Sequence, residues 1–168
     1  MLMGAKVTTI LGQGKIVGSE RGLCYFSIYR NMSDMGSWLA VHFPQQEITW
    51  LPEFPLLAQA AKQLNEYLAG DRRSFTIPLD LKGTPFQTKV WTKLLAISYG
   101  STTTYGALAA VAGHTRAARA VGGAMRTNPL PIFVPCHRVL RADGSLGHYG
   151  GGKELKRWLL QLEGAKVD

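Results

Sequence analysis

The stretch "NPLPIFVPCHRVL", from Asn128 to Leu140, holds a cysteine directly followed by a histidine in an otherwise apolar run. A thiol reacts as its thiolate, so Cys136 could act as a nucleophile if His137 or another group takes its proton. Adjacent side chains on an extended chain point to opposite sides, so the two can communicate only through a turn or a bridging water. The carboxylate of Glu163 is a candidate for orienting the imidazole. A nucleophilic Cys136 is one interpretation, and a buried core thiol is the other.

The glycine-rich stretch "GHYGGGKE" at residues 147–154 nearly matches a phosphate-binding loop. The match fails at Glu154, which stands where a hydroxyl would bind magnesium, so we reject nucleotide binding. The stretch is then a hinge, or a loop against whose backbone a flat ligand can lie. Two further polar residues are candidates for the same site. Tyr105 begins a helical stretch and either packs or donates a hydrogen bond to a ligand, and Asn128 precedes Pro129, a pair that favours a turn.

The cysteine content limits the remaining chemistry. The chain has only two cysteines, Cys24 and Cys136, and their spacing indicates no disulfide framework. Cys24 lies in an apolar, strand-like run and is predicted to be a buried core thiol. Because there is no CxxC or HxxxH pair, a cysteine-based zinc site is not expected. These features favour a reducing compartment, and we expect neither a signal peptide nor a membrane span.

Positive charge is concentrated in the C-terminal half of the chain. The net charge is +8 over 168 residues, and residues 79–168 hold 12 Lys and Arg against 5 Asp and Glu. Residues 1–78 are nearly balanced, with 7 against 6. A polyanion such as nucleic acid is the natural partner for this positive field. The alternative is a basic surface that serves only solubility.

The first 78 residues are predicted to form an α+β domain. Residues 5–50 have the composition and the glycine punctuation of strands, including "GLCYFSIYR" at 22–30 and "WLAVHFP" at 38–44. Apolar residues at helical spacing predict a helix over 52–70. An extended connection follows, and we place the domain boundary between residues 78 and 79.

The second domain, residues 79–168, opens on a capping-box signature at Thr84 and Gln87. Two short helical patterns follow, one over 104–112 and one from after Thr115 to about residue 125. A glycine-containing turn joins them, which predicts a helix-turn-helix. The second helix carries three arginines among alanines and glycines, namely Arg116, Arg119 and Arg126.

The closing stretch "KELKRWLLQLEG" is also predicted to be a helix. Its apolar stripe consists of Leu155, Trp158, Leu159 and Leu162. Glu163 lies at the carboxyl end, where the helix dipole disfavours a negative charge. This local conflict indicates another role for Glu163.

In this order and spacing, "TTTYGALAAVAG", "RAARAVGGAMRTNPLPIFVPCHRVL", "GHYGGG" and "LLQLEG" closely resemble the O6-alkylguanine-DNA alkyltransferases, or methylated-DNA–protein-cysteine methyltransferases. The resemblance covers residues 82–164, whereas residues 1–78 match only in size and element pattern. It implies an α+β fold. An N-terminal ribonuclease-H-like domain, a small antiparallel sheet with a helix, would precede a C-terminal winged-helix (helix-turn-helix) domain.

The resemblance implies direct-reversal DNA repair by a methylated-DNA–[protein]-cysteine S-methyltransferase. The alkyl group of O6-alkylguanine, with O4-alkylthymine as a further candidate, would move irreversibly to Cys136, once per molecule and without cofactor or metal. His137 would act as base through a bound water, and Glu163 would hold His137. Asn128 would support the turn, and Tyr105 would donate a hydrogen bond to the flipped base. The base pocket would be lined by Met125, Val139, Tyr149 and Gly150, the last of which replaces a serine found in many relatives.

The implied partner is double-stranded DNA, bound in the minor groove without strong sequence preference, with the damaged nucleotide flipped out of the stack. Arg119 would fill the gap that the nucleotide leaves. The residues expected to contact DNA are Arg119, Arg116, Arg126, Thr104, Ala117, Ala120 and Gly122. The protein would be a cytoplasmic monomer with no membrane partner.

Two other functions stay open at this point. A winged-helix module that only binds lesions would be indifferent to the loss of Cys136. A Cys-His-Glu hydrolase would turn over many times and would need an oxyanion site. The hydrolase leaves the basic helix-turn-helix unexplained.

Overall fold

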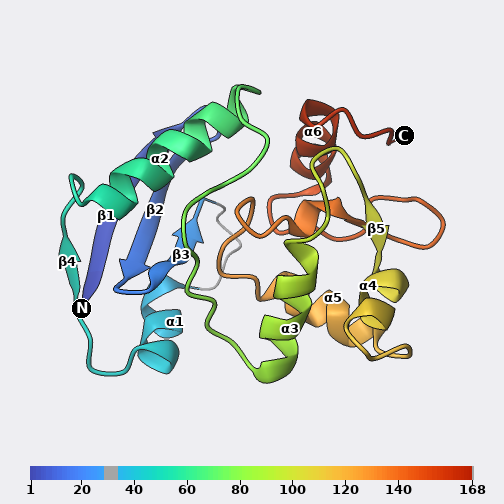
Figure 1. The fold of residues 1–168 in the computed structure, drawn as a ribbon, viewed down its shortest axis with the longest axis horizontal. Coiled ribbons are helices and arrows are strands. Elements are labelled where there is room, and N and C mark those ends of the chain that lie inside the picture. The colour runs from blue at the N-terminus through green and yellow to red at the C-terminus, as the bar shows by residue number, and fades with distance from the viewer. Residues whose placement is uncertain (29–33, 168) are drawn as a thin grey trace. The chain divides into compact units, whose positions relative to one another are not determined.

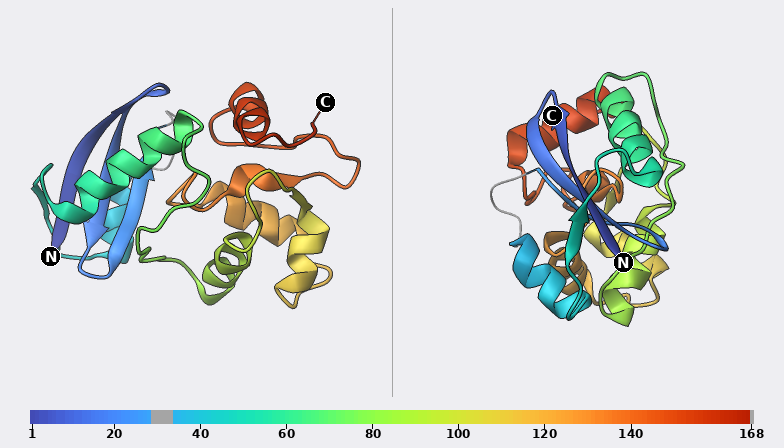
Figure 2. Two further views of the ribbon diagram at one scale, coloured as in Figure 1. Left: turned by 45° about the horizontal axis from the view of Figure 1, so that its top comes forward. Right: turned by 90° about the vertical axis from the view of Figure 1, so that its left-hand side faces the viewer.

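The computed structural model describes residues 1–28 and 34–167, which form two compact units. Unit 1 comprises Met1–Lys82 and unit 2 comprises Gly83–Asp168. The units therefore meet four residues after the expected boundary at 78/79. Figures 1 and 2 show a sheet with helices in the first unit and a mainly helical second unit. The predicted α+β class is confirmed.

The sheet of unit 1 has the strand order β3-β2-β1-β4. Strands β1 (Leu2–Thr9), β2 (Gly12–Ser19) and β3 (Gly22–Ser27) form an antiparallel meander. Strand β4 (Ile48–Trp50) pairs with β1 in parallel, so the sheet is mixed rather than purely antiparallel. The predicted helix α2 (Pro55–Leu68) covers the sheet and contacts β1, β2 and β3 (Figure 1).

The predicted strand at 38–44 is wrong, because this segment lies in helix α1 (Met35–His42). Asp34 caps the helix by accepting a hydrogen bond from the backbone N–H of Ser37 at 2.9 Å. The helix buries Trp38 and Leu39 in the sheet core. The predicted strand at 22–30 is observed as β3, and its last two residues lie outside the described part of the chain.

The same core contains Cys24, whose predicted burial is confirmed. Its thiol donates to the carbonyl oxygen of Val17 at 3.3 Å. Burial raises the pKa of Cys24 to about 12, so this thiol stays protonated and unreactive at neutral pH.

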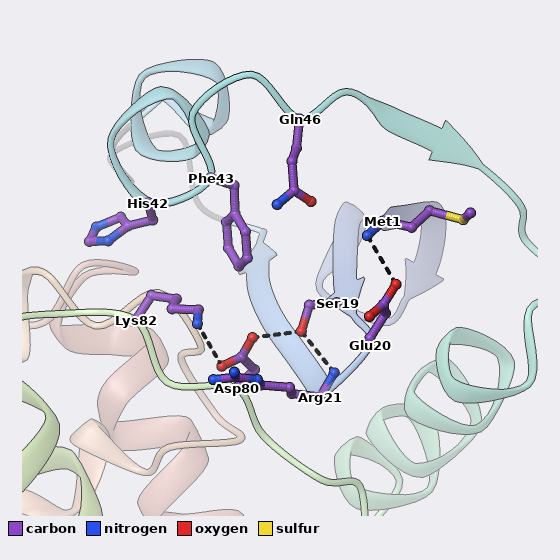
Figure 3. A pocket seen from close by; sticks show the side chains of 9 residues that line it. All are labelled: Met1, Ser19, Glu20, Arg21, His42, Phe43, Gln46, Asp80 and Lys82. Carbon is purple, nitrogen blue, oxygen red and sulfur yellow. Dashed lines mark hydrogen bonds and ion pairs between the residues drawn. The ribbon is translucent and has the colours of Figure 1, made fainter.

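A polar cavity of about 290 Å³ lies within unit 1, and Figure 3 shows the side chains around it. The buried carboxylate of Asp80 accepts a hydrogen bond from the Ser19 hydroxyl at 2.6 Å and pairs with Lys82 at 3.2 Å. Two backbone hydrogen bonds also join this segment to Leu23. The N–H of Leu23 donates to the carbonyl oxygen of Pro78, and the N–H of Asp80 donates to the carbonyl oxygen of Leu23. These contacts hold the segment that ends unit 1 against β3.

Unit 2 contains the predicted helix-turn-helix. Trp91 ties its second helix to the helix at the start of the unit, since the indole N–H donates to the carbonyl oxygen of Ala124 at 2.9 Å. The Thr84–Gln87 capping box is present. The second helix was expected to start directly after Thr115, but it begins two residues later, at Ala118, with Ala117 as its N-cap, so Arg116 precedes the helix. The elements are α3 (Pro85–Leu94), β5 (Thr103–Thr104), α4 (Tyr105–Val111), α5 (Ala118–Arg126), the 3-10 helix η1 (Cys136–Arg138), β6 (Val139–Leu140) and α6 (Lys153–Leu162).

Candidate active site

The segment from Asn128 to Leu140 is buried and internally braced. The Asn128 side chain accepts from the N–H of Leu130 at 2.9 Å and donates to the carbonyl oxygen of Val134 at 3.0 Å. Between them Ile132 adopts a φ of 75°, a conformation that costs a β-branched residue about 1–2 kcal/mol. The two Asn128 bonds, and a backbone bond from Val134 to Leu130, hold this strained turn in place.

Cys136 begins η1, the turn that follows this brace. Because residues on a 3-10 turn do not alternate as they do on a strand, the side chains of Cys136 and His137 need not point to opposite sides. Cys136 is buried, and burial raises the pKa of its thiol. A hydrogen bond from Asn128 and the charge of Lys156 oppose that rise. At neutral pH the resting group is therefore a thiol that needs a base to become a nucleophile.

His137 and Glu163 form a fully buried pair. The distance between Nε2 of His137 and Oε1 of Glu163 is 2.9 Å. Burial lowers the pKa of His137, and the hydrogen bond and charge of Glu163 oppose that shift. A neutral imidazole that donates from Nε2 to a carboxylate carries its lone pair on Nδ1. The pair thus offers a base at Nδ1 of His137.

Arg138 holds the Glu163 carboxylate by both of its oxygens, a role that the sequence analysis did not assign. Its Nε lies 2.9 Å from Oε2, and its Nη2 lies 2.7 Å from Oε1. Nη1 donates to the carbonyl oxygen of Ile97 at 2.6 Å, and the backbone N–H of Gly100 donates to Oε2 of Glu163 at 3.2 Å. The only signal in the sequence was an arginine inside a buried run, directly after Cys136 and His137.

Lys156 is the second functional residue that sequence reasoning missed. Its side chain has no exposed surface, and α6 packs against η1 (Figures 1 and 2). The ammonium donates to the carbonyl oxygens of Val139 at 2.6 Å, Leu146, and His148 at 3.5 Å. Lys156 therefore ties β6 to the loop that carries the glycine-rich stretch. The buried face of α6 differs from the predicted apolar stripe. The helix buries Lys156, Leu159 and Leu160, and of these only Leu159 belongs to that stripe.

The burial of Lys156 predicts a pH-dependent stability. Burial lowers its pKa from 10.5 to about 8, so between these values the unfolded chain holds a proton that the folded protein lacks. The contribution of Lys156 to the free energy of unfolding therefore rises with pH across this window, by up to about 3 kcal/mol.

Urea unfolding of the wild type and of Lys156→Met at about pH 7 and about pH 10 checks this. The stability of the wild type relative to the variant should increase at the higher pH. An unchanged difference would contradict the assignment of a strained, buried charge to Lys156.

A cavity of about 520 Å³ opens beside Tyr105. It brings together five of the predicted site residues, namely Tyr105, Met125, Arg119, Arg126 and Gly122. Ala118, a further small residue of α5, also lines it, together with three residues that the sequence analysis did not select, namely Gly123, Arg141 and His148. Gly147 adjoins it with a φ of 73°, and a Cβ there would stand 3.0 Å from the Tyr105 hydroxyl oxygen. The close approach of the loop to Tyr105 thus requires glycine.

The remaining predicted residues lie outside that cavity lining. Val139 is buried, and its carbonyl oxygen faces Lys156. The Tyr149 ring is buried, with its centroid 6.5 Å from that of His137. Thr104 caps α4 by accepting from the N–H of Ala107 at 3.1 Å. Three others are exposed or half-exposed around the start of α5, and one is exposed on the glycine-rich loop: Arg116, Ala117, Ala120 and Gly150.

In the described residues, no helix is both long and apolar enough to cross a membrane. Within the same part of the chain, no three His, Cys, Asp or Glu side chains cluster in a way that could hold a metal ion.

Comparison with known proteins matches both halves of the chain to one family. Residues 85–165 match the 6-O-methylguanine DNA methyltransferase DNA-binding domain, and residues 5–81 match the ribonuclease-like domain of the same proteins. The constitutive methylated-DNA–protein-cysteine methyltransferase of Bacillus subtilis is 52% identical over 112 residues, covering 66% of this chain and 68% of the relative. The Methanosarcina acetivorans protein of that name is 38% identical over 92% of this chain and 94% of the relative.

Solved structures agree with these matches. The crystal structure of Mycobacterium tuberculosis OGT in complex with DNA has a TM-score of 0.82 and 38% identity, covering 96% of this chain and 92% of that one. O6-methylguanine-DNA methyltransferase from Pyrococcus kodakaraensis has a TM-score of 0.65 and 31% identity, covering 98% of this chain and 100% of that one.

Proposed function

The chain belongs to the 6-O-methylguanine DNA methyltransferase family, and on that premise we propose that it repairs DNA by moving the alkyl group of O6-alkylguanine to Cys136. The observation that carries this assignment is the place of Cys136 on η1, directly before a buried His137–Glu163 pair. The enzyme class is methylated-DNA–[protein]-cysteine S-methyltransferase. Each molecule acts once, because the product thioether is inert.

The reaction begins when the thiol of Cys136 loses its proton. Nδ1 of His137 accepts that proton through a bridging water, while Glu163 holds Nε2 and stabilises the imidazolium that forms. The thiolate attacks the alkyl carbon of the flipped base, so a C–S bond forms as the C–O6 bond breaks. The electron pair leaves on guanine, and the Tyr105 hydroxyl supplies a proton to the departing base.

The flipped base enters the cavity beside Tyr105 and lies against the buried segment from Asn128 to Leu140. Met125 and Tyr149 line its faces, and the carbonyl oxygens of Cys136 and Val139 accept from its exocyclic amine. The Val139 oxygen also accepts from Lys156, which is compatible because a carbonyl oxygen has two lone pairs. The backbone N–H of Gly150 is the donor to O6 where many relatives have a serine.

DNA binds along α5, through the minor groove and without strong sequence preference. The small side chains of Ala117, Ala120 and Gly122 permit close approach to the sugar-phosphate walls, and Thr104 lies at the start of the preceding helix. Arg116 and Arg126 contact phosphates, and the charge excess of residues 79–168 adds affinity that does not depend on sequence. The protein acts as a monomer in the reducing cytoplasm.

Arg119 provides a specific prediction within this proposal. Its exposed side chain lines the cavity mouth and would occupy the stack position of the flipped nucleotide. Arg119→Ala should therefore slow the reaction with O6-methylguanine in duplex DNA by about 10-fold or more, because unstacking costs a few kcal/mol. The reaction with free O6-benzylguanine should change little. Single-turnover rates on both substrates check this, and equal slowing would indicate a packing role.

The stoichiometry of repair tests the proposed function itself. Excess duplex DNA with one O6-methylguanine is incubated with a known amount of protein, and the restored guanine is counted by chromatography. One guanine per protein molecule is expected. Many guanines per molecule would indicate a hydrolase, and none at all would leave only lesion binding.

A further inference from the structure

Arg138 contacts the candidate active site through several hydrogen bonds, although no step of the alkyl transfer uses it. It is buried, and its guanidinium contacts both carboxylate oxygens of Glu163, at 2.9 Å from Nε to Oε2 and 2.7 Å from Nη2 to Oε1. The remaining nitrogen, Nη1, is fixed on the Ile97 carbonyl oxygen at 2.6 Å. The guanidinium carbon also lies 5.9 Å from the centre of the Tyr99 ring. A planar fork anchored in this way defines where the carboxylate can lie.

The Glu163 carboxylate therefore lies between two partners of different kinds. Oε1 receives both Nη2 of Arg138 and Nε2 of His137, at 2.7 and 2.9 Å. The Tyr99 hydroxyl donates to the carbonyl oxygen of Leu162 at 3.1 Å, which fixes the chain just before Glu163. Because the site is buried, a lone carboxylate would act strongly on the imidazole beside it. The permanent cation of Arg138, which contacts both carboxylate oxygens, balances that charge.

The groups that face His137 come from several elements. Glu163 follows α6, Lys156 lies on α6, Cys136 and Arg138 flank His137 on η1, and Tyr149 lies on the following loop. Burial is the largest influence lowering the pKa of His137, and Arg138 and then Lys156 lower it further, while Glu163 raises it. Glu163 and Arg138 thus act in opposite directions on the protonation of His137.

We propose that Arg138 is a positioning residue for the alkyl transfer. Its guanidinium fixes Glu163 on Nε2 of His137 and balances the carboxylate charge, so that His137 rests as a neutral base able to accept the thiol proton. This inference rests on the function proposed above. Arg138 is buried against Glu163 and acts through that carboxylate, not on the reacting atoms.

The test compares Arg138→Met with Arg138→Lys in the full chain. Nitrogen NMR of the His137 imidazole is followed against pH, with His137→Gln used to assign the signal. In Arg138→Met the midpoint should move upward by about one pH unit or more, because a nearby cation has been removed. The acid limb of the single-turnover rate with free O6-benzylguanine should move with it. Arg138→Lys keeps the charge, so its midpoint should stay near that of the wild type while its rate falls.

A double variant shows whether Arg138 acts through Glu163. Adding Arg138→Met to Glu163→Gln removes both members of the Arg138–Glu163 ion pair, so neither is left buried without its partner. The rate should then fall by less than about 3-fold beyond that of Glu163→Gln alone. An equal loss in both backgrounds would overturn the inference, as would an unmoved His137 midpoint in Arg138→Met. If Arg138→Met does not fold, a His137 midpoint shifted in Arg138→Lys overturns it instead.

The NMR titration needs no alkyl transfer, so the two proposals fail separately. A wild-type protein that transfers no alkyl group would refute the proposed function while the His137 midpoints remained readable. A wild-type protein that transfers one group, combined with a midpoint insensitive to Arg138, would refute only the inference.

Discussion

Cys136→Ser should abolish alkyl transfer while binding to lesion-containing DNA persists. A serine hydroxyl is far less acidic than a thiol, and the buried site already opposes ionisation of the native thiol. His137 would then have no group that it could convert to a nucleophile at neutral pH. The expected loss is on the order of 10⁶-fold, the size of loss found when a hydrolase loses its nucleophile.

The measurement is the single-turnover rate with methylated duplex DNA, together with the binding of the same DNA by fluorescence anisotropy. Cys24→Ala is the matched control, because Cys24 is a buried core thiol kept protonated by its environment. The control should transfer one alkyl group per molecule at a rate near that of the wild type. Transfer by Cys136→Ser at a comparable rate would place the acceptor elsewhere.

His137→Gln should lower the transfer rate by about 10²–10⁴-fold, the usual contribution of a positioned base. The glutamine amide can still donate to Oε1 of Glu163, so the buried carboxylate keeps a partner. What is lost is the acceptor on the other side of the ring. Because the thiol must then ionise unaided, the rate of the variant should rise about tenfold per pH unit until the thiol titrates.

Single-turnover rates of the wild type and His137→Gln between about pH 6 and about pH 9 check this prediction. The wild type should show a plateau above the midpoint of His137, which burial holds below its ordinary value. A variant with the plateau of the wild type, or with a rate within about threefold of it, would exclude His137 as the base.

The sequence allowed the elements with strong local signals to be predicted. The capping box at Thr84 and Gln87 specifies the start of α3 through local contacts, and it was located from sequence. The segment at 38–44 was misjudged because a short apolar run fits a strand or a helix equally well. The cap at Asp34 and the burial of Trp38 against the sheet stabilise the helical conformation of this segment.

The candidate site was predictable only in part, for a physical reason. Cys136, His137 and Glu163 were selected because their types could do chemistry together, and the fold brings the last two to 2.9 Å. Arg138 and Lys156 were missed because arginine and lysine are rarely buried, so composition places them on the surface. Their partners are a carboxylate 25 residues away and backbone carbonyls, and periodicity reveals neither.

The most direct test of the account is the mass of the protein after repair. The wild type is incubated with duplex DNA containing O6-methylguanine, and the intact protein and its peptides are weighed. We predict a gain of one methyl group per molecule, located on the peptide that contains Cys136 and its neighbour His137. An unchanged mass after the lesion has been repaired, or a methyl group on Cys24 or any other residue, would contradict it.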